Sequence, residues 1–270
     1  MKPIPPENLD PNSILTRLQT RQLGRTLRIL DKCTSTSDAA AQLASYGASH
    51  GYTVLAEEQT AGRGRQDRTW LSPRGGIWMT LVLRPPFVFN PLDTLPLLGA
   101  LAVARTVNSS LGIKANVRWP NDIVVGRQKL AGVLAETTFI GNQLQYTLLG
   151  IGINANFHPS EIKEIFPTPT TLLELLGSPI DREELICVLL LETEHMYELA
   201  SSKLDEDLLN LLRELDCSRE KHVKIGIGTE EISGVLEDYD TFTKIRIRTA
   251  QGSRVDLETS SVASVEYIDF

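Results

Sequence analysis

The spacing of apolar residues changes near residue 220, and this change limits the folds that the chain can adopt. Before it, DREELICVLLLETEHMYELA is typical of a helix, with Asp181 ahead of the first turn and Glu184 three residues on, as in a capping box. A second helical stretch covers about 204–216. From 222 onward, short alternating runs separated by glycine or aspartate turns predict a small β-barrel.

The chain before this change is predicted to mix strands with helices. Strand patterns cover 26–33, 51–58, 75–85 and 142–156, and helical spacing covers 38–46 and 91–112. Tight connections between several strands require a sheet that is at least partly antiparallel. We therefore predict an α+β fold with a lead-in segment at 1–24, a main domain at 25–220 and a barrel domain at 221–270.

The overall charge argues against binding of long polyanions. The 270 residues include 27 Lys and Arg against 34 Asp and Glu, a net charge of −7. The overall electrostatic field of an acidic protein does not attract nucleic acid, although the protein can still have a local anion-binding site. We therefore predict no nucleic-acid partner.

Signals for metals, disulfides and membranes are weak. The three cysteines form no CxxC pair, and the four histidines show no metal-ligand spacing. The start of the sequence lacks the pattern of a secretory leader, and no apolar run approaches the ~20 residues of a membrane span. These features predict a cytoplasmic protein without a membrane partner.

The stretch EEQTAGRGRQDRTW concentrates arginine in an otherwise acidic chain. Gly62 and Gly64 let backbone N–H groups approach a ligand, and Arg63 and Arg65 offer forked donors that suit phosphate or carboxylate. Trp70 adds a flat face for stacking. The alternative is a mobile surface loop with solvated arginines, and the sequence pattern alone leaves both interpretations open.

The stretch RWPNDIVVGRQKLAGVLAE predicts a hairpin with polar residues at a strand end. Pro120 breaks the first strand, so that Asn121 and Asp122 are aimed off its end. Lys129 lies at the edge of the next, buried strand. The alternative is an ordinary turn lysine in contact with solvent.

Two further stretches are ambiguous by themselves. In LLGIGINANFHP, Gly150 and Gly152 indicate close approach of a ligand or another backbone, and the amide of Asn154 suits either a base edge or a structural role at the strand end. In CTSTSDAA the hydroxyl groups have a default role as caps of the following helix.

Taken together, these stretches closely resemble the biotin protein ligases, the biotin–[acetyl-CoA-carboxylase] ligases, over about residues 27–270. The motifs are S-T-S at 35–37, E-x-Q-x-A-G-R-G-R at 57–65, W at 70, R-W-P-N-D at 118–122, G-x-x-K-L-A-G-V-L-x-E at 126–136 and G-I-G-I-N at 150–154. The resemblance implies a central mixed β-sheet with flanking helices, as in class II aminoacyl-tRNA synthetases, and a C-terminal SH3-like barrel.

The resemblance also implies an activity. Members of the family use ATP and Mg²⁺ to convert biotin into biotinyl-5′-AMP, and then transfer biotin to one lysine of the biotin carboxyl carrier protein of acetyl-CoA carboxylase. Two anionic reactants must meet, so fixed cations are needed to offset their repulsion and the charge of the transition state.

The resemblance assigns roles residue by residue and leaves the metal ligands unidentified. The catalytic group is Lys129, Arg65 and Arg63. The residues implied for biotin are Ser35, Thr36, Ser37, Gln59, Gly62, Arg63, Gly64, Arg65, Lys129 and Gly132. The residues implied for ATP or the adenylate are Arg65, Arg68, Trp70, Asn121, Asp122, Lys129 and Asn154.

Two departures from the family pattern stand out. The first motif reads S-T-S-D where many relatives have S-T-N, and Asp67 brings a negative charge into the arginine loop. Some relatives are also repressors, but only about 25 residues precede the first predicted strand here. We therefore expect no DNA-binding domain, and the sequence leaves a homodimer through the sheet edge as an open possibility.

Three rival functions remain. A lipoate ligase or octanoyl transferase shares the fold, although the GRGR loop followed by tryptophan favours biotin. A non-catalytic RNA- or nucleotide-binding module would use the arginine loop and the barrel, against which the net acidity argues. A scaffold would hold biotinyl-AMP without turnover.

Overall fold

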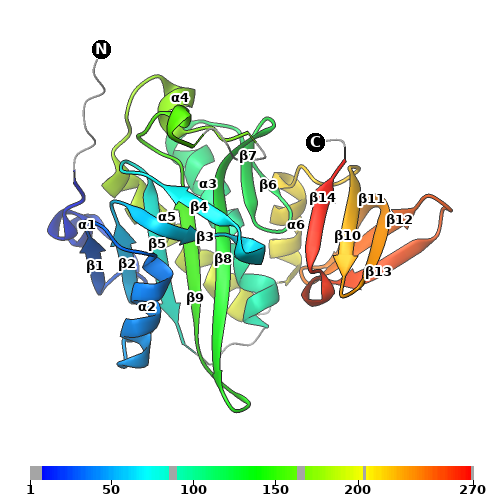
Figure 1. The fold of residues 1–270 in the computed structure, drawn as a ribbon, viewed down its shortest axis with the longest axis horizontal. Coiled ribbons are helices and arrows are strands. Elements are labelled where there is room, and N and C mark those ends of the chain that lie inside the picture. The colour runs from blue at the N-terminus through cyan, green and yellow to red at the C-terminus, as the bar shows by residue number, and fades with distance from the viewer. Residues whose placement is uncertain (1–7, 85–89, 163–167, 203–204, 269–270) are drawn as a thin grey trace.

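A seven-stranded mixed sheet forms the centre of the protein (Figure 1). The computed structural model describes residues 8–84, 90–162, 168–202 and 205–268, apart from the side chains at 67, 91, 93 and 205. The strand order is β1 (Leu27–Leu30), β2 (Thr53–Ala56), β5 (Ile77–Leu83), β9 (Gln143–Ile153), β8 (Gln128–Ile140), β7 (Asp122–Val125) and β6 (Ala115–Arg118). Only the β1–β2 pairing in this sheet is parallel, which confirms the predicted mixed sheet.

Long helices cover one face of this sheet. Helix α3 (Pro91–Leu111) packs on β8 so closely that a Cβ added to Gly99 would lie 2.8 Å from Val133 Cγ1. The helical spacing predicted over 91–112 is confirmed: Leu97, Leu98 and Leu101 are buried, and Gly112 ends the helix in a left-handed conformation (φ 64°). Helix α5 (Arg182–Ser201) lies beside α3. None of the described helices combines the length and apolar character of a membrane span.

The opposite face carries α2 (Thr36–Ser45) and a two-stranded hairpin, β3 (Gln59–Arg63) and β4 (Thr69–Ser72). The sequence predicts only a loop where this hairpin forms. The pattern gave no strand signal because glycine and arginine are poor strand formers, and the burial of strand β3 alternates only partly. In Figure 1 the hairpin crosses in front of β8 and β9.

Caps and local contacts fix the remaining helices. The Asp181 carboxylate accepts a hydrogen bond from Glu184 N, as the capping pattern predicts. Part of the predicted lead-in segment is ordered: α1 (Pro11–Arg17) packs against α5 and buries Ile14 fully. Short helix α4 (Leu172–Leu176) and helix α6 (Asp205–Leu215) complete the set.

A second, five-stranded antiparallel sheet follows residue 222, where the apolar period changes. Its order is β13 (Arg254–Glu258), β12 (Lys244–Thr249), β11 (Glu230–Thr241), β10 (His222–Ile227) and β14 (Ser264–Tyr267). This sheet fits the predicted SH3-like domain. The recorded pairing leaves β13 and β14 as its two edges among the described strands.

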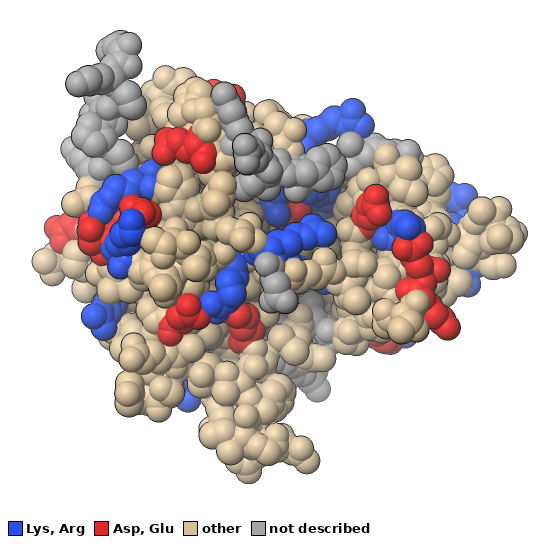
Figure 2. Space-filling view, viewed as in Figure 1, with Lys and Arg blue, Asp and Glu red and all other residues tan. Residues whose placement is uncertain are grey.

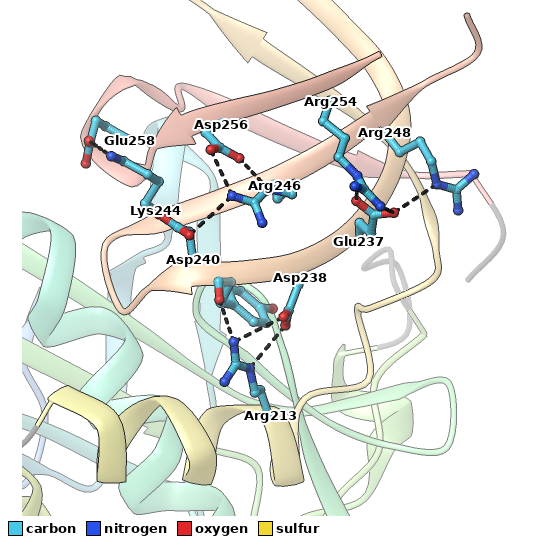
Figure 3. A network of polar contacts seen from close by, with 11 residues as sticks. Arg213, Glu237, Asp238, Asp240, Lys244, Arg246, Arg248, Arg254, Asp256 and Glu258 are labelled. Atoms are coloured by element: carbon cyan, nitrogen blue, oxygen red, sulfur yellow. Dashed lines mark hydrogen bonds and ion pairs between the residues drawn. The ribbon is translucent and has the colours of Figure 1, made fainter. Parts of the chain in front are cut away.

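Polar contacts join the small sheet to α6 and neutralise its cations (Figure 3). Arg213 of α6 bonds Asp238 and the carbonyl of Tyr239 at 3.1 and 2.9 Å. Three strand cations pair with neighbouring carboxylates: Lys244 with Glu258, Arg246 with Asp256 and Arg254 with Glu237. One hydrophobic cluster also runs through both sheets, so the division into domains near 218–222 stays a prediction.

A buried ion pair ties three distant segments together. Glu57 and Arg182 approach to 2.9 Å, and both side chains are 3% exposed. Glu57 also accepts a hydrogen bond from Leu9 N, and Arg182 donates to the carbonyl of Gly76. The pair therefore holds the N-terminal segment, the end of β2 and the start of α5 in one arrangement.

Glu57→Gln is expected to destabilise the fold by about 3 kcal/mol, because it leaves the Arg182 charge buried without its carboxylate. Urea unfolding followed by circular dichroism measures the change. The neighbouring Glu58→Gln is the matched control: Glu58 pairs with the exposed Lys32, and such a pair contributes under about 1 kcal/mol. Equal losses in the two variants would contradict the assignment.

Candidate active site

A cavity of about 750 Å³ crosses the sheet face that carries the hairpin. Strands β5, β9, β8 and β7 contribute to it, together with α2, the hairpin and β14 of the small sheet. In Figure 2 Lys and Arg side chains gather across the middle of this face. The cavity brings together most of the predicted site residues: Ser35, Thr36, Ser37, Gln59, Arg63, Gly64, Arg65, Arg68, Trp70, Asn121, Asp122, Lys129 and Gly132.

One end of the cavity is lined with neutral hydroxyl and amide groups. The N–H and hydroxyl of Thr36 both donate to Gln59 Oε1, at 2.7 and 3.0 Å, while Gln59 Nε2 donates to Ser72 Oγ. The Thr36 hydroxyl lies 2.8 Å from Thr80 Oγ1 on β5. These bonds fix the orientation of the Gln59 amide, and Ser35 caps α2 as the default interpretation predicts.

Two glycines form the floor in the middle. Gly132 of β8 lies directly opposite Gly152 of β9, and the indole of Trp70 rests on both. A Cβ on Gly152 would lie 2.7 Å from Trp70 Nε1, so only glycine admits the ring here. Trp70 Nε1 is buried and has no hydrogen-bond partner in the described part of the chain.

The other end of the cavity is charged and centres on Asp122. Its two carboxylate oxygens contact Lys129 Nζ at 2.6 Å and Arg118 Nη2 at 2.7 Å. Burial alone would raise the pKa of Asp122, but the charges of Lys129 and Arg118 outweigh burial and hold that pKa below its usual value. The lysine ammonium also lies 5.0 Å from the ring centroid of Trp70. The Lys129 ammonium is therefore fixed by its contacts with Asp122 and Trp70, and the alternative of a solvated turn lysine is wrong.

Arg65 and Arg68 are cations of a different kind. Neither guanidinium has a hydrogen bond or ion pair with any side chain that the structure describes. Burial lowers the pKa of Arg65, and Asp122 partly opposes this shift, yet a guanidinium stays protonated in proteins. Arg65 is partly buried whereas Arg68 is exposed, so Arg65 is the cation beside which an anion would be stabilised most.

Arg63 is paired with carboxylates of the protein, and its predicted role as an anion ligand stays a prediction. It lines the cavity, but its guanidinium bonds Glu136 of β8 at 3.1 Å and Asp38 of α2. Two carboxylates already neutralise it, so Arg63 fixes the base of the hairpin. The aspartate in S-T-S-D thus has a structural partner, whereas the side chain of Asp67 lies outside the described residues.

The tip of the hairpin touches the small sheet. Gln66 takes a left-handed conformation (φ 57°) and its side-chain amide donates to the carbonyl of Ala263 at 2.7 Å. Gly64 N bonds the carbonyl of Arg68 across the tip. The stretch is therefore an anchored hairpin in which Arg63 is paired and Arg65 is partly buried, whereas Arg68 is exposed to solvent as the alternative expects.

Two predicted residues do not line the cavity. Gly62 faces the hairpin partner, where an added Cβ would lie 2.4 Å from the carbonyl oxygen of Trp70. Asn154 is 2% exposed, and its amide donates to the carbonyls of Lys129 and Thr170, at 3.3 and 3.0 Å. Asn154 thus supports the backbone of Lys129, which fits the structural alternative left open by the sequence; the predicted contact with the nucleotide stays a prediction.

Sequence reasoning missed several lining residues. Arg118 stands in the quoted motif R-W-P-N-D, so its charge next to Asp122 was a usable signal. Thr80 and Tyr267 had no such signal in the sequence. Each lies in an ordinary strand pattern and reaches the cavity only through the pairing of distant segments. No group of three or more His, Cys, Asp or Glu side chains within the described ranges has the arrangement of a metal site.

Comparison with known proteins extends the picture. The sequence model of the Biotin/lipoate A/B protein ligase family matches residues 30–154. The bifunctional ligase/repressor BirA of Bacillus subtilis is 37% identical over 194 residues, which are 71% of this chain and 60% of that protein. The chain thus spans about 60% of the length of this curated relative.

Other relatives are matched over more of their length. A structure of biotin protein ligase from Aquifex aeolicus in complex with biotin and ATP is 28% identical, with a TM-score of 0.77, covering 90% of this chain and 99% of that one. The biotin–[acetyl-CoA-carboxylase] ligase of Mycobacterium tuberculosis is 31% identical over 227 residues, 80% of each chain. The chain described here belongs to the biotin protein ligase family.

Proposed function

We propose that this protein is an ATP-dependent biotin protein ligase, which forms biotinyl-5′-AMP and transfers biotin to a lysine of a biotin carboxyl carrier protein. The observation that carries the proposal is the meeting of Lys129, Arg65 and Arg68 in one cavity whose other end is neutral and rich in hydroxyl groups. The related Aquifex protein binds biotin and ATP, and the Mycobacterium relative is named for acetyl-CoA carboxylase.

The neutral end suits the ureido ring of biotin. That ring has a carbonyl acceptor and two N–H donors, and Ser35, Thr36, Ser37 and Gln59 offer both donors and acceptors at fixed positions. The glycine pair leaves room for an extended apolar chain above the sheet. Since the indole of Trp70 now covers that pair, biotin entry must move the indole, which is then free to pack on the adenylate.

The charged end suits the reacting groups. The Lys129 ammonium would contact the biotin carboxylate and the α-phosphate together, and its ion pair with Asp122 fixes its direction. Arg65 and Arg68 would offset phosphate charge as the carboxylate oxygen attacks phosphorus and pyrophosphate leaves. A closed hairpin excludes water from the mixed anhydride until the carrier lysine attacks its acyl carbon and AMP departs.

Mg²⁺ remains a prediction that the side chains do not by themselves support. Asp122 is the only carboxylate among the predicted site residues, and each of its two oxygens contacts a cation of the protein. We expect the metal to arrive with the nucleotide phosphates. The cytoplasmic location, the carrier of acetyl-CoA carboxylase as partner, and a homodimer likewise stand as proposals.

One assay separates the proposal from its rivals. Biotin-dependent ATP–pyrophosphate exchange tests the first step, and transfer of labelled biotin to a carrier domain tests the second. A lipoate ligase would respond to lipoate or octanoate instead, a scaffold would fail only the second step, and a binding module would fail both. The paired cations of the small sheet argue against the binding module.

Lys129→Ala is expected to slow biotinyl-AMP formation roughly 100- to 1,000-fold, because it removes a preorganised charge at the reacting centre. Single-turnover formation of labelled adenylate measures the change. Lys114→Ala, at an exposed lysine on the lead into β6, is the matched control and should leave the rate unchanged. An unaltered rate in Lys129→Ala would remove this lysine from the mechanism.

Arg65→Ala is expected to speed the escape of biotinyl-AMP about 10- to 100-fold, the loss of one charge-assisted contact of ~1.5–3 kcal/mol. Filter retention of preformed intermediate measures the release rate. Arg63→Ala provides a contrast, because the Arg63 guanidinium is already paired with Glu136 and Asp38. Loss of these ion pairs should lower the melting temperature of the protein, in addition to any effect on release. Identical effects of both variants would contradict the distinction.

A further inference from the structure

A line of contacts runs from the last strand of the small sheet into the charged end of the cavity. It starts at Tyr267 of β14, passes through Arg118 at the end of β6 and Asp122 at the start of β7, and ends at Lys129 of β8. Tyr267 is 148 residues from Trp119, the first residue of the turn between β6 and β7. The sheet that follows residue 222 therefore reaches the lysine through three side chains.

The first link is a clamp on the turn. Tyr267 Oη donates to the carbonyl oxygen of Trp119 at 2.6 Å and lies 2.9 Å from Ser218 Oγ. Ser218 Oγ in turn accepts from Trp119 N at 2.8 Å. Both backbone polar groups of Trp119 are thus held by side chains from outside the turn that separates Arg118 from Asp122.

The second link acts on the guanidinium itself. The ring of Tyr267 faces Arg118, whose Cζ lies 5.7 Å from the ring centroid. Arg118 is 7% exposed, and both this ring and the 2.7 Å bond to Asp122 act on its guanidinium. Asp122 divides its oxygens between Arg118 and Lys129, and a displaced guanidinium would therefore displace the carboxylate that aims the lysine.

We propose that Tyr267 is a positioning residue for Lys129, acting through Arg118 and Asp122 to hold the ammonium where adenylate forms. This inference rests on the proposed ligase function. It makes the small sheet a part of the first chemical step, even though Tyr267 itself need not touch biotin.

The neutral end of the cavity lies outside this line of contacts. It is built from α2, β3 and β5, and its hydrogen bonds do not involve the small sheet. Disturbing Tyr267 should therefore slow the chemical step while leaving biotin binding nearly unchanged. A general loss of folding would instead weaken both.

The experiment uses the full chain and compares Tyr267→Leu with Tyr267→Phe, each alone and combined with Asp122→Asn. The leucine variant removes ring and hydroxyl, and the phenylalanine variant keeps the ring. We expect adenylate formation in single turnover to fall about 10- to 100-fold in the leucine variant and less in the phenylalanine variant, with the biotin dissociation constant changed less than about threefold.

The double variants decide the route of the effect. If Tyr267 acts through Asp122, replacing Tyr267 in the Asp122→Asn background should cause little further loss of the rate of adenylate formation. Full losses in both backgrounds would overturn the proposal, since they would mean that Tyr267 contacts the nucleotide or acts by itself. An unchanged rate in both Tyr267 variants would overturn it as well.

Two controls distinguish an effect on the positioning of Lys129 from a general effect on folding. Lys244→Gln changes a cation of the same small sheet that pairs with Glu258, outside this line of contacts, and should leave the rate unchanged. If Tyr267→Leu does not fold, as judged by its melting curve, Tyr267→Phe with and without Asp122→Asn carries the same test. An unmutated chain that makes no adenylate at all would count against the ligase function, not against this inference.

Discussion

The carboxylate of Asp122 is the interaction on which the charged end of the site depends. It accepts from Lys129 and Arg118 at once, so three charges from β6, β7 and β8 share one buried arrangement. Removing one member of such a group leaves an uncompensated charge, which is costly in a poorly solvated place. The same burial makes the arrangement precise enough to aim an ammonium at a reacting carboxylate and phosphate.

Other polar groups of the cavity lack a partner among the described side chains. Arg65 and Arg68 have no carboxylate partner among the described side chains, and Trp70 covers the glycine pair with its indole N–H unbonded. A ligand with an anionic head and a chain narrow enough for the glycine floor would relieve both. The hairpin that carries these residues is anchored at its base by Arg63 and at its tip by Gln66, which limits how its closure can proceed.

Much of the fold and the position of the cavity could be predicted from the sequence because the signals were local. Apolar spacing and caps located the longer helices α2, α3, α5 and α6, and the apolar period located the small sheet, while several chemistry-bearing motifs fell near strand ends. The roles of individual site residues were harder to predict from the sequence. Arg63 and Arg65 are two residues apart and identical in type, yet one meets Glu136 and Asp38 while the other meets no partner in the described structure. Nothing in G-R-G-R distinguishes them, since the carboxylates come from other elements.

The sequence by itself determined the family, the mixed sheet, the period-two strands after 222 and the stretches that supply the site, because motif order and apolar spacing are properties of neighbouring residues. Tertiary structure alone decided that the arginine stretch forms a hairpin, that Asn154 supports the backbone of Lys129, and that Tyr267 contacts Arg118. Those outcomes depend on which distant strands pair and in what register, and a single residue of register moves a side chain to the other face of a sheet.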